Sequence, residues 1–312
     1  MPQDNKNQSG KSIKTRITTS EIYTTVKQNY NEPIVEQFFL DMYQEYQPCK
    51  QLSPYIDKYW EFKGNPEQRT RINILPDGCT DFIFTLENSP QALNDNLTMQ
   101  PFHTYFIGPM TGYSELVTYT KTVHILGIRF RPYGIFRFLE LPLHELTDQR
   151  LYAGDINTFF NDSWTQQLSE QQSTIKQISL IETRLIQALY EYKPVPDKPI
   201  LYAIDQINTF KGKLSIHTLV DNVCLSQRHF ERKFKTYTGY TPKEYSRIVK
   251  FRNAVDILRK TTFDNLLSIA IETGYYDVPH LSREIKKMSG NTPLSFLSLP
   301  PESETALLYI ER

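Results

Sequence analysis

The 312-residue chain is poor in cysteine, has no long apolar run and carries no net charge. Its three cysteines, Cys49, Cys79 and Cys224, lie far apart, so their spacing supports neither a C-x-x-C metal pair nor a disulfide framework. We therefore expect no metal and no cofactor. No apolar stretch approaches the ~20 residues that a membrane helix needs. The polar N-terminal segment also lacks the apolar core of a signal peptide. These absences favour a cytoplasmic protein with no membrane partner.

The absence of net charge would argue against a nucleic-acid partner if the charges were spread evenly. They are not. Residues 200–300 hold 15 basic and 9 acidic side chains, a balance of +6, which leaves −6 for the rest of the chain. A basic module joined to an acidic one is expected when one part of a protein approaches phosphates.

The most informative feature is a sequence pattern that occurs twice. The stretch from Leu214 to Pro242 is answered by the stretch from Leu266 to Pro293. The spacing between equivalent residues is constant, since 277 − 226, 283 − 232 and 293 − 242 all equal 51. One supersecondary unit has been used twice.

The first copy predicts two helices around a tight turn. Ile216 and Leu219 belong to one apolar stripe, Ser226 is a good N-cap, and Phe230 and Phe234 form a second stripe with a spacing of four. This order is typical of a helix-turn-helix motif.

The second copy predicts the same order of helix, turn and helix from different residues. Gly274 supplies the permissive residue of the turn, Asp277 caps the next helix, and Pro279 suits its first turn. Leu281 and Ile285 are expected to point inward. Both copies therefore predict the same pair of helices.

The outward faces of the two second helices carry cations in the same register. At 100° per residue, the residues opposite the apolar stripes are Arg228, Arg232 and Lys235 in the first copy and Pro279, Arg283 and Lys286 in the second. A guanidinium can bridge two acceptors on a guanine edge or grip a phosphate, and a helix fits the major groove. Two solvated faces of a helical bundle are the alternative, but the duplicated register favours DNA.

These residues resemble a known family. The elements that carry the resemblance are Ser226-x-Arg228-x-Phe230-x-Arg232-x-Phe234, Gly239-x-x-Pro242-x-x-Tyr245, Lys250-Phe251-x-x-Ala254-x-x-Ile257-Leu258 and Ile269-Ala270-x-x-x-Gly274-Tyr275-x-Asp277. Over about residues 200–298 they are similar to the DNA-binding domain of AraC/XylS-type transcriptional regulators. That resemblance implies two helix-turn-helix units, joined by a long helix over 242–260, that sit in successive major grooves.

The resemblance also implies which side chains face the DNA. The residues expected at base edges are Arg228, Glu231, Arg232, Val278, Pro279, Ser282 and Arg283. The residues expected at phosphates are Lys235, Thr241, Lys286, Lys287 and Thr292. Two departures stand out: Leu281 and Ile285 replace the usual phenylalanines, and Val278 with Pro279 leaves the second helix poor in hydrogen-bond donors.

The N-terminal half predicts strands. Residues 124–131 alternate and end at Pro132, residues 81–86 and 104–108 form further short runs, and Pro76-Asp77-Gly78 marks a turn. Many short strands with regular turns indicate a small β-barrel or sandwich. Helical spacing returns at Phe136, Phe138 and Leu139 and again over 175–189. Residues 34–46 fit either a short helix or, from Met42, the first strand.

This half, with Tyr59-Trp60, 75–81 and 126–132, looks like the uncharacterised β-rich domain often found ahead of the same DNA-binding unit, and resembles the cupin-like sensor of the family at fold level. An enzyme is the competing hypothesis, because Asp77, Cys79 and Asp81 are close in sequence and His103 and His124 are available. A turn, a small core thiol and structural histidines explain the same residues. The four-thiolate zinc site of a DNA-repair fusion needs more cysteines than the chain has.

The sequence thus predicts an α+β protein of two domains: a β-barrel or sandwich (cupin-like) with flanking helices, then an all-α double helix-turn-helix. The expected boundaries are a partly disordered extension (1–41), a sensor or dimerisation domain (42–193), a proline-rich linker (194–199), the DNA-binding domain (200–300) and a tail (301–312). The expected function is that of a bacterial, nucleoid-associated transcriptional regulator. Activation is the expected effect, although the sequence does not separate activation from repression. Double-stranded DNA is the expected partner, with RNA polymerase, a small effector and a second copy of the chain left open. An architectural DNA-bending protein and a DNA-tethered enzyme are the alternatives.

Overall fold

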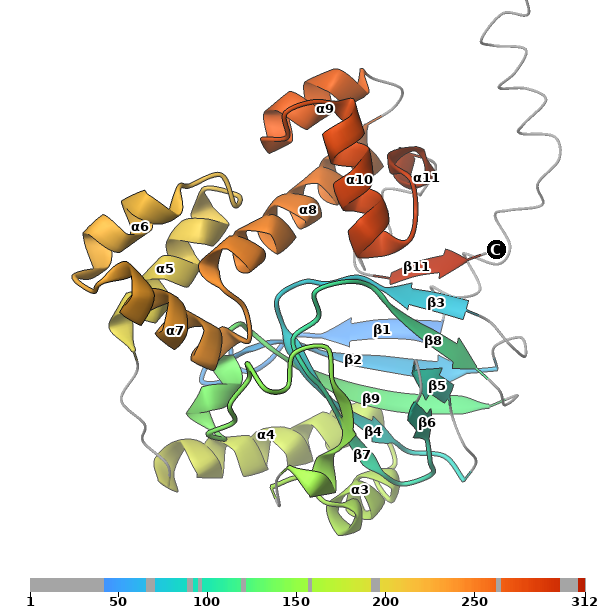
Figure 1. The fold of residues 1–312 in the computed structure, drawn as a ribbon. Helices are drawn as coiled ribbons and strands as arrows, with labels where there is room; N and C mark the ends of the chain where they lie inside the picture. The colour runs from blue at the N-terminus through green and yellow to red at the C-terminus, as the bar shows by residue number, and fades with distance from the viewer. Residues whose placement is uncertain are drawn as a thin grey trace, which may run out of the picture. The chain divides into compact units, whose positions relative to one another are not determined.

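The structure is a computed structural model that describes residues 42–65, 71–88, 92–94, 97–118, 122–156, 159–191, 197–261, 265–297 and 308–311. The expected extension 1–41 lies outside these ranges. Within them, the chain has a β-rich half followed by a helical half, as the sequence predicted (Figure 1).

Two antiparallel sheets form the β-rich half. The first has six strands in the order β1 (Tyr43–Tyr46), β2 (Ile56–Gly64), β9 (Val123–Phe130), β4 (Thr80–Thr85), β7 (Thr104–Ile107) and β10 (Arg150–Tyr152). The second has five in the order β11 (Leu308–Glu311), β3 (Arg71–Ile74), β8 (Ser114–Thr118), β5 (Ala92–Asn94) and β6 (Leu97–Met99). Neither strand order closes on itself. Of the two expected architectures, an open sandwich describes this half better than a barrel.

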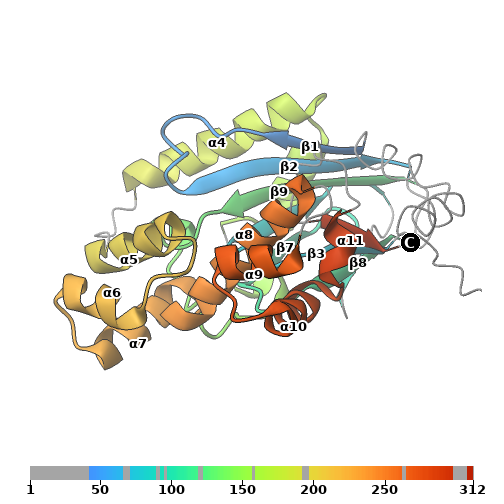
Figure 2. The same ribbon diagram turned by 90° about the horizontal axis from the view of Figure 1, so that it is seen from above.

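Strand alternation explains why both faces of the six-stranded sheet are buried. Leu126 and Ile128 on β9 pack with Phe84 on β4 against α3 (Asp162–Ser169) and α4 (Thr174–Glu191). The intervening residue Ile125 faces the other way and joins a cluster with Leu116 of the second sheet. Figures 1 and 2 show α4 running along one face of the sheet. The predicted strand at 124–131 is therefore correct, and the sheet has helices on one side and strands on the other.

One expectation for this half changes, one open alternative is decided, and one further element was not expected. The expected helix around Phe136–Leu139 is a single 3-10 turn, η1 (Gly134–Arg137). Its first residue, Gly134, lies directly against the Tyr55 carbonyl, where there is no room even for a Cβ. A second 3-10 turn, η2, spans Ala153–Asp155. Residues 43–46 are a strand, so the helix considered for 34–46 does not extend through them.

The first helix of the helical half begins at Lys198, within the proline-rich stretch 194–199 that was expected to be a linker. Residues 192–196 lie outside the described ranges. Asp197 caps α5 (Lys198–Thr209) by accepting a hydrogen bond from the Ile200 amide at 3.4 Å. Pro199 occupies the first turn, where its missing N–H costs nothing. At the other end of the chain, residues 308–311 of the expected tail form β11 and pair with β3.

The helical half continues with α6 (Ile216–Val223), α7 (Gln227–Thr238), α8 (Pro242–Lys260), α9 (Leu266–Thr273), α10 (Val278–Ser289) and α11 (Pro293–Leu297). One core unites them, and its fully buried members include Phe230, Phe234, Phe251, Leu281 and Ile285. The long helix α8 starts with a capping box in which the Thr241 hydroxyl and the Glu244 carboxylate each satisfy the other's backbone amide.

Within the described residues, none of the helices has both the length and the apolar character needed to cross a membrane.

Candidate DNA-binding surface

The two helix-turn-helix units have matching boundaries. α7 and α10 are each 12 residues long and start 51 residues apart, at Gln227 and Val278. Each is capped by the predicted residue: Ser226 accepts from the His229 amide at 3.4 Å, and Asp277 accepts from the His280 amide at 2.7 Å. Each ends at a glycine in the left-handed region. The sequence repeat is thus a structural repeat.

The two turns differ by one residue. α6 and α9 are each eight residues long but start 50 residues apart, so the second unit holds one extra residue between its helices. Cys224 ends α6 in the left-handed conformation at φ 52°, whereas Gly274 ends α9 at φ 82°. The extra residue lies among Tyr275, Tyr276 and Asp277, directly before the second helix.

The first outward-facing helix, α7, is anchored by two aromatic rings. Phe230 and Phe234 are fully buried, with their ring centroids 5.8 Å apart. Arg228 and Arg232 are exposed on the opposite side, as predicted. Glu231 is half-buried and accepts a hydrogen bond from Gln227 at 2.9 Å, so its carboxylate already has a partner on the same helix.

The second outward-facing helix, α10, repeats this arrangement with aliphatic anchors. Leu281 and Ile285 are fully buried and replace the two phenylalanines of α7. Pro279 and Arg283 are exposed, and Ser282 is half-buried. Val278, also half-buried, completes the predicted set. A face with so few donors suits contact with thymine methyl groups better than hydrogen bonds to base edges.

The residues expected at phosphates divide into two groups. Lys235, Lys286 and Lys287 are exposed near the C-terminal ends of their helices. Thr292 is exposed and lies 3.2 Å from the Ser295 hydroxyl. Thr241 differs, because its hydroxyl is engaged in the capping box of α8 and bonds Glu244 at 2.9 Å. Its contribution to this surface is the position of the helix start.

Sequence reasoning missed the ion pair that holds α10 to α8. Arg247 of α8 bonds Glu284 of α10 in a two-pronged arrangement, with Nε to Oε2 at 3.0 Å and Nη2 to Oε1 at 3.0 Å. Lys250 of the same helix lies over the Tyr275 ring at 5.8 Å, and burial lowers its pKa. Both side chains point to protein partners, so these two basic residues of α8 serve the fold. No sequence pattern separates them from the cations on the outer face.

Tyr276 was also missed. Its side chain is 89% exposed, an unusual state for so large a ring, and it directly precedes the cap of α10. The adjacent Tyr275 is buried and packs edge-on against His280. The sequence of the Tyr275–Tyr276 pair does not indicate which ring is exposed, because the conformation of the turn between the two helices determines their exposure.

The structure gives the two histidines of the enzyme alternative other partners than the Asp77–Asp81 stretch. Asp77, Cys79 and Asp81 are buried, and burial raises the pKa of the Cys79 thiol, which makes it a poor nucleophile. His124 lies 2.9 Å from Glu61, and His103 lies 3.6 Å from Asp162. The described part of the chain contains no group of three or more histidine, cysteine or acidic residues placed to hold a metal ion.

Two family models match separate parts of the chain. Residues 219–298 match the family described as a helix-turn-helix domain. This match begins within α6 and extends past α11, so it covers both repeated units. Residues 44–152 match a family described as a domain of unknown function, DUF6597.

Individual proteins resemble parts of the chain. It is 29% identical over 80 residues to the HTH-type transcriptional regulator ArgR of Pseudomonas aeruginosa, a match that covers 26% of this chain and 24% of that regulator. The chain thus spans about a quarter of the length of that relative. Among solved structures, ToxT from Vibrio cholerae aligns with a TM-score of 0.44 at 10% identity, over 77% of this chain and 97% of ToxT.

Proposed function

We propose that the protein is a sequence-specific transcriptional regulator that binds double-stranded DNA in the bacterial cytoplasm, at the nucleoid. The observation that carries the proposal is the repeated recognition helix. Arg232 and Arg283 are exposed at equivalent positions of two 12-residue helices whose caps, ends and buried faces match. Two solvated faces of a bundle would have no reason to keep that register.

In the proposed complex, α7 and α10 enter two adjacent major grooves. Arg228, Arg232 and Arg283 read or anchor at base edges, with Glu231 and Ser282 as shorter polar contacts and Val278 and Pro279 as apolar ones. The helix α8 spans 19 residues, about 28 Å at 1.5 Å per residue. This rigid spacer suits two readers held about one DNA turn, ~34 Å, apart.

The exposed lysines would set the register on the backbone. Lys235, Lys286 and Lys287, with Thr292 and the segment around Thr241, are proposed to contact phosphates. Such contacts carry no sequence information, so the arginines and the apolar face of α10 would supply the specificity.

The β-rich half is proposed to sense a small effector, to dimerise, or both. The support is that this half is a well-packed sandwich with two hydrophobic clusters of its own, and that it precedes a helix-turn-helix domain. RNA polymerase would be a further partner if the protein activates transcription. A non-enzymatic role fits the burial of Cys79 and the separation of His103 and His124 from it.

Selection of binding sites from random duplexes by the full chain tests the proposal. We expect recovery of two conserved blocks about one helical turn apart, one for each recognition helix. Recovery of no enriched sequence, with bending of every duplex alike, would support an architectural protein instead. Failure to retain any duplex at low ionic strength would refute DNA binding altogether.

A further inference from the structure

The loop Leu75–Cys79, between β3 and β4, is buried along its whole length. Loops normally run over the surface, because a buried loop must satisfy its backbone polar groups without water. What covers this loop is the helical domain. Leu75 is 1% exposed and belongs to the hydrophobic core that contains Phe230 and Leu281. This strand connection therefore contributes to the core of the DNA-binding half.

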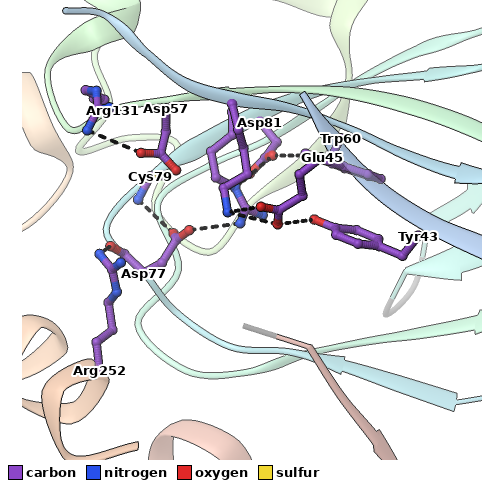
Figure 3. A network of polar contacts seen from close by, with 11 residues as sticks. Tyr43, Glu45, Asp57, Trp60, Asp77, Cys79, Asp81, Arg131 and Arg252 are labelled. Carbon is purple, nitrogen blue, oxygen red and sulfur yellow. Dashed lines mark hydrogen bonds and ion pairs between the residues drawn. The ribbon is translucent and has the colours of Figure 1, made fainter. Parts of the chain in front are cut away.

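The contact between this loop and α8 leaves no room for a larger side chain. Gly78 adopts φ +86°, and a Cβ at this position would lie 2.6 Å from the Tyr245 ring on α8. Arg252, two turns further along α8, donates from Nη1 to the Asp77 carbonyl at 3.1 Å. Figure 3 shows Arg252 reaching to Asp77, the residue whose own carboxylate turns toward the sheets.

The Asp77 side chain joins the loop to the space between the two sheets. Its Oδ1 accepts from the Cys79 amide at 2.8 Å, which shapes the turn, and its Oδ2 lies 3.2 Å from Arg129 Nη1. Arg129 in turn bonds Asp81 at 3.1 Å, and Asp81 accepts from the indole N–H of Trp60 at 2.7 Å. A continuous polar chain runs from Trp60 to α8.

The polar network between the sheets contains two carboxylates but one guanidinium, and a second cation reaches it from the helical half. Asp77, Asp81 and Arg129 are each at least nine-tenths buried, so two carboxylates share one guanidinium within the sandwich. Burying an uncompensated carboxylate is strongly unfavourable. Arg252 is the second cation near Asp77, and α8 supplies it. Docking of α8 thus completes the electrostatics of the sandwich.

We propose that the loop Leu75–Cys79 is an interdomain latch, through which the Trp60–Asp81–Arg129–Asp77 chain and the helix α8 sense each other's state. The proposal rests on the proposed function, because α8 carries both recognition units. An effector or a second copy of the chain that rearranges the inter-sheet network would shift the loop. The loop would then shift α8, the helix that separates the recognition helices α7 and α10. By linkage, DNA held by those readers must perturb the inter-sheet chain to the same degree.

Trp60 gives a direct readout of this linkage. The chain has two tryptophans, so 5-fluorotryptophan labelling of the full chain gives two fluorine resonances. The second, Trp164, is packed among Phe84 and Phe160 on the far face of the sheet and serves as an internal reference. Addition of a duplex recovered by random-site selection should shift the Trp60 resonance and leave that of Trp164 in place.

The variant Arg252→Met keeps side-chain length but removes the donor to the loop. It should still bind the duplex, with an affinity altered about 5-fold or more, and should lose the Trp60 shift. Asp77→Asn keeps the carbonyl that accepts from Arg252 but weakens the next link, the ion pair with Arg129. It should also lose the Trp60 shift, and the double variant should change affinity no further, because the two links lie in series. The matched control is Arg131→Met, which breaks the exposed pair with Asp57 on the same sheet. It should keep the shift.

The latch is refuted if wild-type protein binds DNA without moving the Trp60 resonance. It is equally refuted if Arg252→Met keeps the full shift, or if Arg131→Met loses it to the same extent. Should the protein bind no duplex, the proposed function fails while the latch remains testable without DNA. In that case Arg252→Met must accelerate hydrogen exchange at the Cys79 amide relative to wild type and to Arg131→Met; an unchanged rate would overturn the latch.

Discussion

At the scale of single residues, the proposed DNA-binding surface depends on which basic side chains contact other protein groups and which are exposed to solvent. Arg247 is committed to Glu284, and Lys250 lies over Tyr275. Arg232 and Arg283 are instead exposed on helices whose other faces are buried. A cation held by a carboxylate has little left to offer a base edge, so Arg247 is less available for such a contact than the exposed Arg232 and Arg283.

Replacing Arg232 with Ala should weaken binding to the selected site by about 1–3 kcal/mol if its guanidinium spans two base acceptors. Binding to unrelated duplexes should fall much less. Titration by fluorescence anisotropy at one fixed salt concentration measures both, with Lys176→Ala on α4 as a control outside the helical domain. Equal losses on selected and unrelated duplexes would assign Arg232 to the phosphates.

Replacing Lys286 with Gln should weaken every duplex by a similar factor, because a phosphate contact does not depend on sequence. The slope of log K against log salt should become shallower by about 1. Binding isotherms at several salt concentrations give this slope directly. A loss confined to the selected site, at an unchanged slope, would contradict the phosphate role.

At the scale of elements, the helix ends carry much of the architecture. Gly239 and Gly274 both end helices at φ +82°, where a Cβ is strained by about 1–2 kcal/mol. Their surroundings differ. A Cβ at Gly274 would meet the flexible Lys213 side chain at 3.1 Å, whereas at Gly239 it would lie 2.4 Å from Pro109 of the β-rich half.

Gly239→Ala should therefore lower the free energy of unfolding by more than Gly274→Ala, which should cost about 1–2 kcal/mol. The extra loss in Gly239→Ala comes from the collision with a rigid ring rather than from the helix end itself. Chemical denaturation of the two variants alongside wild type measures the difference. Equal losses would mean that the Pro109 contact yields easily.

A buried carboxylate ties the helical layer to the six-stranded sheet. Glu61 on β2 accepts from Thr174 at the start of α4 at 2.6 Å and from Tyr46 on β1 at 3.0 Å, and lies 2.9 Å from His124 on β9. Burial alone would raise the pKa of Glu61. The hydrogen bonds from His124, Thr174 and Tyr46 outweigh it and lower the pKa from 4.5 to about 2.

Because the folded pKa lies below the unfolded value, the ionised Glu61 stabilises the fold fully above about pH 4.5. That contribution, on the order of 3 kcal/mol, is lost as the pH falls from there toward 2. Glu61→Gln cannot titrate, so its stability should decline less steeply between pH 5 and pH 3. Urea unfolding across this range is the measurement. Parallel curves for the two proteins would exclude Glu61 as a source of acid lability.

At the scale of the whole molecule, the β-rich and helical halves share a core. Leu75 and Tyr133 come from the β-rich half but are buried with the helices, and the Tyr240 hydroxyl of the helical half bonds the Met110 carbonyl at 3.0 Å. The described residues of the two halves belong to one compact unit. Two domains that share buried side chains are expected to lose structure together.

Both tryptophans, Trp60 and Trp164, lie in the β-rich half, whereas helical circular dichroism reports largely on the other half. In urea, the two signals should change at the same midpoint in wild type. In Gly78→Ala the collision with Tyr245 should separate them, while each half keeps its own transition. Coincident midpoints in this variant would show that the shared core does not depend on the latch loop.

The local elements were largely predictable because their signals are local. The apolar stripes, caps and end glycines of α7 and α10 sit within a few residues of one another, and these helices start and end where those residues indicate. The strand β9 followed from alternation, and β4 and β7 followed from short apolar runs bounded by turn residues. The turn η1 did not follow in this way: helical spacing around Phe136–Leu139 predicted a helix, and the structure has a single 3-10 turn packed beside Tyr55, which is distant in sequence.

The sequence by itself determined the repeat, the cations in equal register and the class of the C-terminal domain, since hydrophobic periodicity and capping act over one or two helical turns. Only the tertiary structure decided that Arg247 is occupied by Glu284, that Tyr276 is exposed, and that the turn at Asp77 is buried against α8. Asp77 and Arg252 are 175 positions apart. Their contact depends on the packing of both domains, which no short-range pattern encodes.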